Sequence, residues 1–265
     1  IELNDENYLF GLKKFSFQKP RARNYIHEWL FHKISSEKGL INLKYKFINL
    51  SINGDKNQLY VIEEGFGKEL VERNKRRNGP IFGIDEDIFI NEQKLGKKEL
   101  DFDNPVFEIY NKKYWERSEN LKLLENASNK LVGFFNNSIE IQEVFDLKLW
   151  AKYFAIVDLT KNYHGSLLKS VKFYYNPISG LFEPIAFDGH RKNPNFNKFN
   201  KNYDNRILID IIRNPNSYEK FYDNIGWLRK FFYINNEINQ NFYNLYINEL
   251  ANITSEKCIN SFFKK

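Results

Sequence analysis

The sequence predicts an α+β fold in which a small antiparallel-sheet lobe packs against a larger, mostly helical lobe. Two observations support this prediction. Strand-like runs occur in closely spaced pairs joined by turn residues, first within 43–63 and again within 171–187, which is typical of antiparallel hairpins. Segments with apolar residues every three or four positions fill much of the remaining chain, which is typical of amphipathic helices.

The amino-terminal part is expected to contain one prominent helix and one hairpin. Apolar residues recur at helical spacing over 23–35, and Gly39 follows as a stop signal. The runs 43–52 and 58–63 are predicted to be strands because the residues at 53–55, Asn-Gly-Asp, favour a tight turn. A basic helix over 68–77, an extended piece over 81–83 and an acidic, irregular stretch over 85–103 are expected to follow.

The carboxy-terminal part is predicted to be mainly helical around a second hairpin. Helices are expected over 116–136 and 144–160, the second of which is strongly apolar. The hairpin consists of 171–175 and 181–187, with Pro and Gly in the turn between them, and it leads directly into Asp188. Further helices are expected over 207–213, 218–233 and 237–250.

These elements divide into a sheet-containing lobe, 1–110, and a mainly helical lobe, 111–265, without an evident linker. The chain has no methionine and begins with Ile1, so we expect it to be a processed product or a piece of a longer protein. The first lobe is then expected to lack part of its amino terminus.

The composition excludes several classes of protein. A chain of 265 residues with 42% hydrophobic and 17% aromatic residues has too much apolar surface to be disordered. Cys258 is the single cysteine, which excludes an internal disulfide framework and a zinc cluster built on several thiolates. No apolar run is long enough to predict a membrane span. The net charge of +6 is spread along the chain among many acids, so no specific nucleic-acid partner is expected.

Two short motifs resemble known sites but have the wrong spacing. His27 and His32 are one residue further apart than in the H-E-x-x-H zinc motif, which separates the two imidazoles by about 140° around a helix. We therefore expect Glu28 and His32 to form an ordinary surface pair. The stretch Gly65-Phe66-Gly67-Lys68 lacks the glycine spacing and the hydroxyl residue of a phosphate-binding P-loop.

The segment from Asp158 to His190 is the most informative part of the sequence. A helix is followed by a polar loop, a tight hairpin and then Asp188-Gly189, which is the order found in protein kinases. In kinases the Asp after the hairpin holds magnesium against the nucleotide phosphates, because magnesium prefers hard oxygen ligands. Gly189 is expected to let the chain turn sharply beside this carboxylate.

Three blocks in the same order resemble the CotH family of atypical, protein-kinase-like proteins. RARNYIHEWLFHKIS resembles the "RN.l…l" helix of the family, and FINLSINGDKNQLYVIEEGFGKELVERNKRRNGPIF resembles its "v.v.vNG…G.Y.l.E…d…l…G.if" segment. NYHG and FYYNPISGLFEPIAFD resemble its catalytic loop and its "lYr…g.fe.ipwD" hairpin. The resemblance implies a kinase-like fold, ATP and Mg²⁺ (or Mn²⁺) as cofactors, and a bacterial protein of the spore coat or cell envelope.

The resemblance also implies roles for individual residues. Asp188 matches the metal-binding Asp, and Ser170 stands where an Asn ligand is expected. Glu64, Lys68 and Asn162 are the residues implied to contact the nucleotide.

The catalytic loop departs from the better-known members of the family. His164 stands where those members have Asp, and His190 stands where a second Asp follows. A branch of the same family resembles this chain in carrying His in the loop. Either His164 or Asp158 is the candidate proton acceptor, and the sequence leaves the choice open.

Two functions therefore follow from the sequence. The first is an ATP- and metal-dependent kinase that transfers phosphate to a protein hydroxyl. The second is a catalytically inactive relative that binds a nucleotide or a protein partner as a scaffold in a coat or envelope layer. Nucleotide binding without turnover would distinguish the second from the first.

Overall fold

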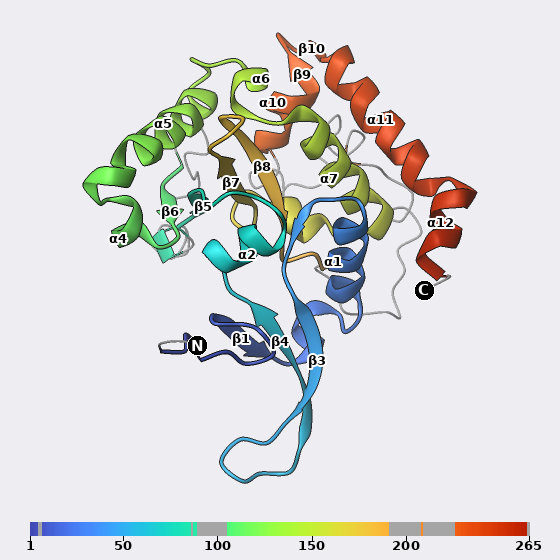
Figure 1. Cartoon of the computed structure of the whole chain (residues 1–265). Coiled ribbons are helices and arrows are strands. Elements are labelled where there is room, and N and C mark those ends of the chain that lie inside the picture. The colour runs from blue at the N-terminus through green and yellow to red at the C-terminus, as the bar shows by residue number, and fades with distance from the viewer. Residues whose placement is uncertain (5–6, 86, 89–104, 191–207, 209–225, 264–265) are drawn as a thin grey trace.

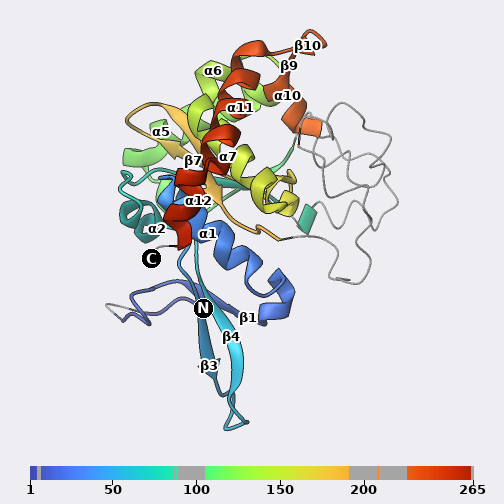
Figure 2. The same cartoon turned by 90° about the vertical axis from the view of Figure 1, so that its right-hand side faces the viewer.

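The computed structural model describes residues 1–4, 7–85, 87–88, 105–190, 208 and 226–263, and these form a mixed α+β fold (Figures 1 and 2). The strands are β1 (Phe15–Gln18), β2 (Ile41–Asn42), β3 (Tyr45–Leu50), β4 (Gln58–Glu64), β5 (Ile81–Ile84), β6 (Phe107–Ile109), β7 (Lys172–Asn176), β8 (Leu181–Ala186), β9 (Tyr233–Ile234) and β10 (Glu237–Ile238). The α-helices are α1 (His27–Glu37), α2 (Lys68–Arg73), α4 (Lys112–Trp115), α5 (Ser118–Phe135), α6 (Ile141–Val144), α7 (Leu147–Thr160), α10 (Arg229–Phe232), α11 (Gln240–Thr254) and α12 (Glu256–Phe263). Short 3-10 turns are η1 (Pro20–Arg23), η2 (Tyr163–Ser166) and η4 (Gly226–Leu228).

The first sheet is antiparallel and has the strand order β1-β4-β3. Its hairpin, β3 and β4, projects away from the rest of the molecule in both views (Figures 1 and 2). Asn53 and Gly54 at the tip have positive φ angles of 54° and 83°, which is the conformation that the Asn-Gly turn favours. The predicted hairpin is thus confirmed.

The second sheet is mixed and has the strand order β2-β8-β7-β5-β6. β2 pairs in parallel with β8, whereas the remaining neighbours are antiparallel. β2, β5 and β6 precede residue 110 and β7 and β8 follow it, so one sheet crosses the lobe boundary that the sequence predicts. Apolar patterning indicates a strand but does not identify its partner, and the parallel pairing of β2 with β8 brings distant parts of the chain together.

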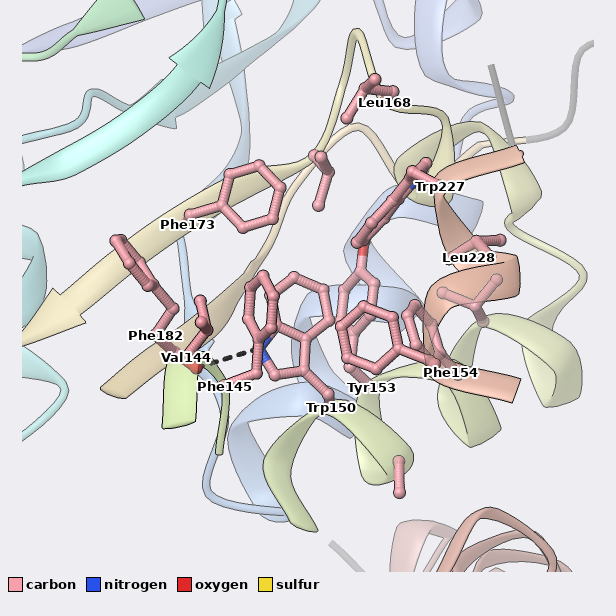
Figure 3. Packing of buried hydrophobic residues seen from close by; sticks show 14 of the residues in the cluster. Val144, Phe145, Trp150, Tyr153, Phe154, Leu168, Phe173, Phe182, Trp227 and Leu228 are labelled. Atoms are coloured by element: carbon pink, nitrogen blue, oxygen red, sulfur yellow. Dashed lines mark hydrogen bonds between the residues drawn. The ribbon is translucent and has the colours of Figure 1, made fainter. Parts of the chain in front are cut away.

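The core is built around α7, which lies between the second sheet and α11 (Figure 3). Trp150, Tyr153 and Phe154 of this helix are completely buried. The Nε1–H group of Trp150 donates to the carbonyl oxygen of Phe182 on β8, at 2.9 Å. α7 is thereby fixed against the hairpin that leads to Asp188.

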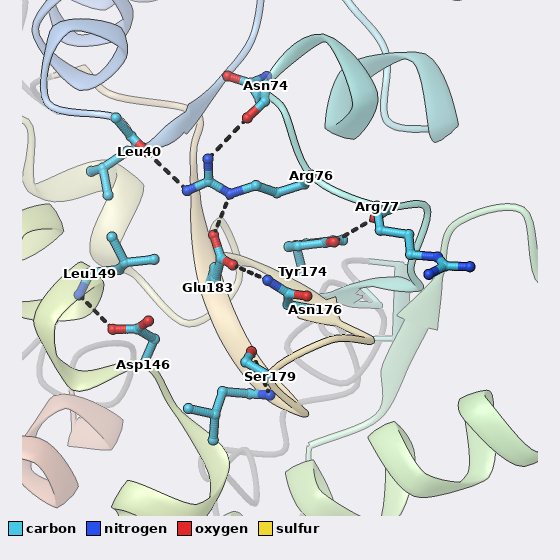
Figure 4. A network of polar contacts seen from close by, with 12 residues as sticks. Leu40, Asn74, Arg76, Arg77, Asp146, Leu149, Tyr174, Asn176, Ser179 and Glu183 are labelled. Atoms are coloured by element: carbon cyan, nitrogen blue, oxygen red, sulfur yellow. Dashed lines mark hydrogen bonds and ion pairs between the residues drawn. The ribbon is translucent and has the colours of Figure 1, made fainter.

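A partly buried ion pair also holds this hairpin (Figure 4). The guanidinium of Arg76 donates to the carboxylate of Glu183 on β8, with an Nε–Oε2 distance of 2.8 Å, and to the carbonyl oxygens of Gly39 and Asn74. The Nδ2 atom of Asn176 on β7 donates to the other oxygen of Glu183 at 2.7 Å. We call Arg76, Glu183 and Asn176 the Arg76 clamp; it ties the β7–β8 hairpin to the segment after α2.

Two helices begin later than the sequence predicts. α1 begins at His27 because η1 precedes it and because Asn24 and Tyr25 have left-handed φ angles of 51° and 61°. α11 begins at Gln240, where the side chain of Asn239 accepts a hydrogen bond from the third following residue as an N-cap. Most of the predicted helices 207–213 and 218–233, and most of the irregular stretch 85–103, lie outside the described residues.

None of the helices that the structure describes is both long and apolar enough to cross a membrane.

Candidate active site

Asp188 follows β8 directly and is the centre of the candidate site. Its backbone has a left-handed φ of 55°, and its side chain is buried. One carboxylate oxygen accepts a hydrogen bond from Ser170 at 2.8 Å and lies 2.6 Å from Nδ1 of His164. The other oxygen lies 3.1 Å from Nδ1 of His190 and pairs with the guanidinium of Arg23. The carboxylate is thus surrounded by groups that favour its ionised form.

One histidine precedes Asp188 in the sequence and the other follows it, and both side chains contact its carboxylate. His164 lies in η2, after α7, and His190 lies two residues beyond Asp188. Their rings are tilted by 32°, with centroids 4.1 Å apart. The ligand atoms of His164, Asp188 and His190 all lie within 4.8 Å of one another, which is a spacing that a metal ion can bridge.

The environment keeps Asp188 charged and favours a neutral His164. Burial by itself would raise the pKa of Asp188, but the hydrogen bonds from the two histidines and the charge of Arg23 outweigh it and hold this pKa well below its usual range. Burial lowers the pKa of His164, and the attraction of Asp188 opposes that effect without cancelling it. A neutral His164 whose Nδ1–H faces Asp188 has Nε2 as a proton acceptor.

Arg23 belongs to the site, although sequence reasoning did not select it. Arg23 is the last residue of η1 and bridges two carboxylates: it pairs with Asp188, and its Nε lies 3.1 Å from Glu28. Burial would lower the pKa of Arg23, but these carboxylates raise it above its ordinary value. A signal was present, since Arg23 is the Arg of the "RN" pair in the first CotH-like block.

Asp158 has a different environment from His164. It is buried on α7, where it accepts hydrogen bonds from the backbone N–H of Leu208 at 2.9 and 3.0 Å and from the hydroxyl of Tyr246. These contacts join α7 to α11. Between the two candidate proton acceptors, His164 is the one that the structure brings to Asp188.

The three residues implied to contact a nucleotide are dispersed. Glu64 pairs with Arg73 and accepts the backbone N–H of Lys44 at 2.8 Å, so it links β4 to α2. Lys68 is exposed and pairs with Glu72 at 3.7 Å on the surface of α2. Asn162 lies two residues before His164 and is fully buried, and neither polar atom of its side chain has a hydrogen-bond partner among the described residues.

A cavity of about 310 Å³ reaches Phe187, the residue before Asp188. It is lined by Asp85, Asp87, Glu108, Tyr110, Lys172 and Phe187. Lys172 is buried, and its ammonium lies 5.8 and 5.6 Å from the ring centroids of Tyr110 and Phe187. Aromatic rings can stack on the base of a nucleotide, and a lysine ammonium can pair with its phosphate. Sequence reasoning missed Lys172, although a lysine inside the apolar run of β7 is an unusual feature.

A scan against protein-family models gives no match, and no curated protein matches the sequence significantly. The resemblance to the CotH family therefore rests on the residues quoted above and stays a prediction.

Proposed function

We propose that the chain is a CotH-like atypical kinase, which transfers phosphate from ATP to a protein hydroxyl and depends on a divalent metal ion. One observation carries the proposal: the loop after α7 and the end of the β7–β8 hairpin converge, so that His164 lies 2.6 Å from the Asp188 carboxylate. A kinase needs this convergence, since the acceptor hydroxyl and the metal-bound phosphate must meet.

Each residue of the site has a proposed role. Asp188, with Ser170 and His190, would hold the metal ion, whose chemistry is to neutralise charge on the phosphates. His164 would accept the proton of the acceptor hydroxyl at Nε2 while Asp188 orients its ring through Nδ1. The buried amide of Asn162 has unused hydrogen-bonding capacity for a ligand group in the loop.

The donor atoms favour manganese over magnesium in this proposal. Magnesium prefers oxygen ligands, whereas the proposed ligand set at Asp188 includes one imidazole nitrogen, from His190, beside a carboxylate and a hydroxyl. Such mixed donors suit Mn²⁺ and related first-row ions. Lys172, which lines the cavity that reaches Phe187, is a better candidate for a phosphate contact than Lys68, which lies on the exposed face of α2.

The second candidate function is an inactive scaffold of a coat or envelope layer that binds a nucleotide or a protein partner. A specific observation favours it: Arg23 already places a positive charge on the Asp188 carboxylate, where an active kinase places its metal ion. In the scaffold, the guanidinium would replace the metal permanently. In the kinase, Arg23 would turn to Glu28, its other partner, when metal binds.

Calorimetry with ATP, in the presence of Mn²⁺ or Mg²⁺, tests both functions on the full chain. The kinase predicts metal-dependent binding and phosphate transfer to the chain itself or to a generic protein acceptor, with both lost in Asp188→Ala. Asp55→Asn, in the exposed turn of the β3–β4 hairpin, is the matched control and should behave as the wild type.

The outcomes separate the hypotheses. Transfer in the wild type that His164→Ala abolishes, with nucleotide binding retained, supports the proton-acceptor role of His164. Binding without transfer supports the scaffold. Folded protein that binds no nucleotide with either metal refutes the kinase proposal.

A further inference from the structure

A second group of potential metal ligands lies beside the first and involves different residues. Glu28 and His32 are one helical turn apart on α1, and Glu63 lies on β4 opposite Tyr45 of β3. We call Glu28, His32 and Glu63 the α1–β4 cluster. The expectation that Glu28 and His32 form a surface pair is wrong, because they are only 0% and 4% exposed and face the first sheet.

The α1–β4 cluster has the geometry of a binding site. One oxygen of each carboxylate and one nitrogen of His32 lie within 4.8 Å of one another. The cluster is almost inaccessible, since Glu63 is only 5% exposed. Three residues on two different elements therefore direct their donor atoms to one point in the interior.

The donor atoms of the cluster are poorly satisfied. Both oxygens of Glu28, both ring nitrogens of His32 and one oxygen of Glu63 have no hydrogen-bond partner among the described residues. Within the described part of the chain, the ion-pair contacts to Glu28 are Arg23 at 3.1 Å and His32 at 3.5 Å. Buried polar groups are rarely left without partners, so this concentration points to a missing ligand.

The charge of the α1–β4 cluster also indicates a missing ligand. Two buried carboxylates face one guanidinium, Arg23, which also pairs with Asp188. Among the residues that the structure describes, Arg23 divides its single charge between Glu28 and Asp188, and a divalent cation at the cluster would add positive charge.

We propose that Glu28, His32 and Glu63 bind a divalent first-row transition metal ion, with Zn²⁺ as the best fit. Imidazole nitrogens and carboxylate oxygens are both ligands that Zn²⁺ accepts in proteins. A cavity of about 580 Å³, bordered by His32 and Tyr45, provides an entry path. The ion would link α1 to β4, and the inference does not depend on the proposed kinase activity.

The test separates this site from the one at Asp188. The full chain carrying Asp188→Asn is stripped with a chelator and titrated with Zn²⁺ by calorimetry and with Co²⁺ by visible absorption. The proposal predicts one bound ion per chain, a d–d absorption band of protein-bound Co²⁺, and a higher unfolding temperature with Zn²⁺.

Glu63→Gln in the same background should abolish the Co²⁺ band and the thermal shift. This variant keeps the shape of the side chain and removes repulsion with Glu28, so it is expected to fold. Glu37→Gln, an exposed change on α1, is the matched control and should leave both signals intact.

Two results would overturn the proposal. The first is a folded Asp188→Asn protein that binds neither ion, since the α1–β4 cluster is unchanged in it. The second is a Glu63→Gln variant that retains the Co²⁺ band. Loss of phosphate transfer alone does not bear on this site, because the readouts are metal binding and thermal stability.

Discussion

Gly189 follows Asp188 and is required by packing rather than by its backbone angles. A Cβ atom at this position would lie 2.2 Å from the ring of Phe31, which is itself completely buried on α1. The expected role of Gly189 in a sharp turn belongs instead to Asp188, which has the left-handed φ. The close approach of Gly189 to Phe31 joins α1 to the strand that carries the site.

Gly189→Ala is therefore expected to destabilise the protein by about 1–3 kcal/mol, because a rigid aromatic ring in a packed core must shift. Urea unfolding followed by circular dichroism measures this loss. Gly226→Ala is the matched control, since nothing lies within 4 Å of its Cβ position. Equal stability of the two variants would show that the Phe31 ring can move aside without a loss of stability.

The pKa of Asp158 predicts a pH dependence of stability. Burial raises this pKa from 3.8 to about 6, and the hydrogen bonds from Tyr246, Leu208 and Tyr163 and the charge of Lys161 offset only part of the effect. In the folded state the Asp158 carboxyl group then keeps its proton at pH values where the same group in the unfolded chain has released it. Stability must fall as pH rises from about 4 to about 6, because the folded state binds more protons in that range.

Asp158→Asn should remove this contribution. The free energy of unfolding of the wild type, relative to the variant, is expected to drop by roughly 2 kcal/mol between pH 4 and pH 6 and to become constant above about pH 7. Urea unfolding of both proteins across this range measures the difference. A constant difference would mean that Asp158 titrates alike in the folded and unfolded chains.

At the scale of elements, the Arg76 clamp holds the hairpin on which the candidate site depends. Glu183 is buried on β8, and its carboxylate is shared between Arg76 and Asn176. Removing Arg76 would leave a buried charge without its counterion, which costs more than the pair contributes when intact.

Arg76→Met is expected to destabilise the protein by about 2–3 kcal/mol, a value reduced because Arg76 is partly exposed. Adding Glu183→Gln should recover part of the loss, since the unpaired charge is then removed. Urea unfolding of the wild type, the two single variants and the double variant gives a double-mutant cycle, which measures the coupling energy between Arg76 and Glu183. Lys68→Met breaks only the exposed pair with Glu72 and should change stability little; a similar loss there would contradict the argument.

At the scale of the whole molecule, the hydrophobic core joins the two predicted lobes. Phe31 and Phe82, from before residue 110, belong to the same buried cluster as Trp150, Phe173 and Phe231. The second sheet also combines strands from both sides of that residue. The described parts of 1–110 and 111–265 thus share one core.

A fragment of residues 1–110 is therefore expected not to fold alone, since β2 and β5 lose their partners β8 and β7. Circular dichroism of the fragment should show no cooperative thermal transition, whereas the full chain should show one. A cooperative transition in the isolated fragment would instead establish an independent lobe at this boundary.

The elements with strong local signals could be predicted from the sequence. The β7–β8 hairpin follows from its Pro and Gly turn, and α7 follows from its apolar spacing, because both depend on neighbours close in the chain. The resemblance to the CotH family implied Asp188, His164 and Ser170 as site residues, and the structure places their side chains in contact.

Only the tertiary structure decided which distant side chains share the interior. The sequence by itself determined the α+β class, the local elements and Asp188 as the residue to examine. It did not determine that Arg23 pairs with Asp188, that Glu28 and His32 are buried against Glu63, or that Asp158 serves the packing of α7 on α11. These facts depend on which faces pack together, and burial and charge compensation are properties of that packing rather than of local sequence.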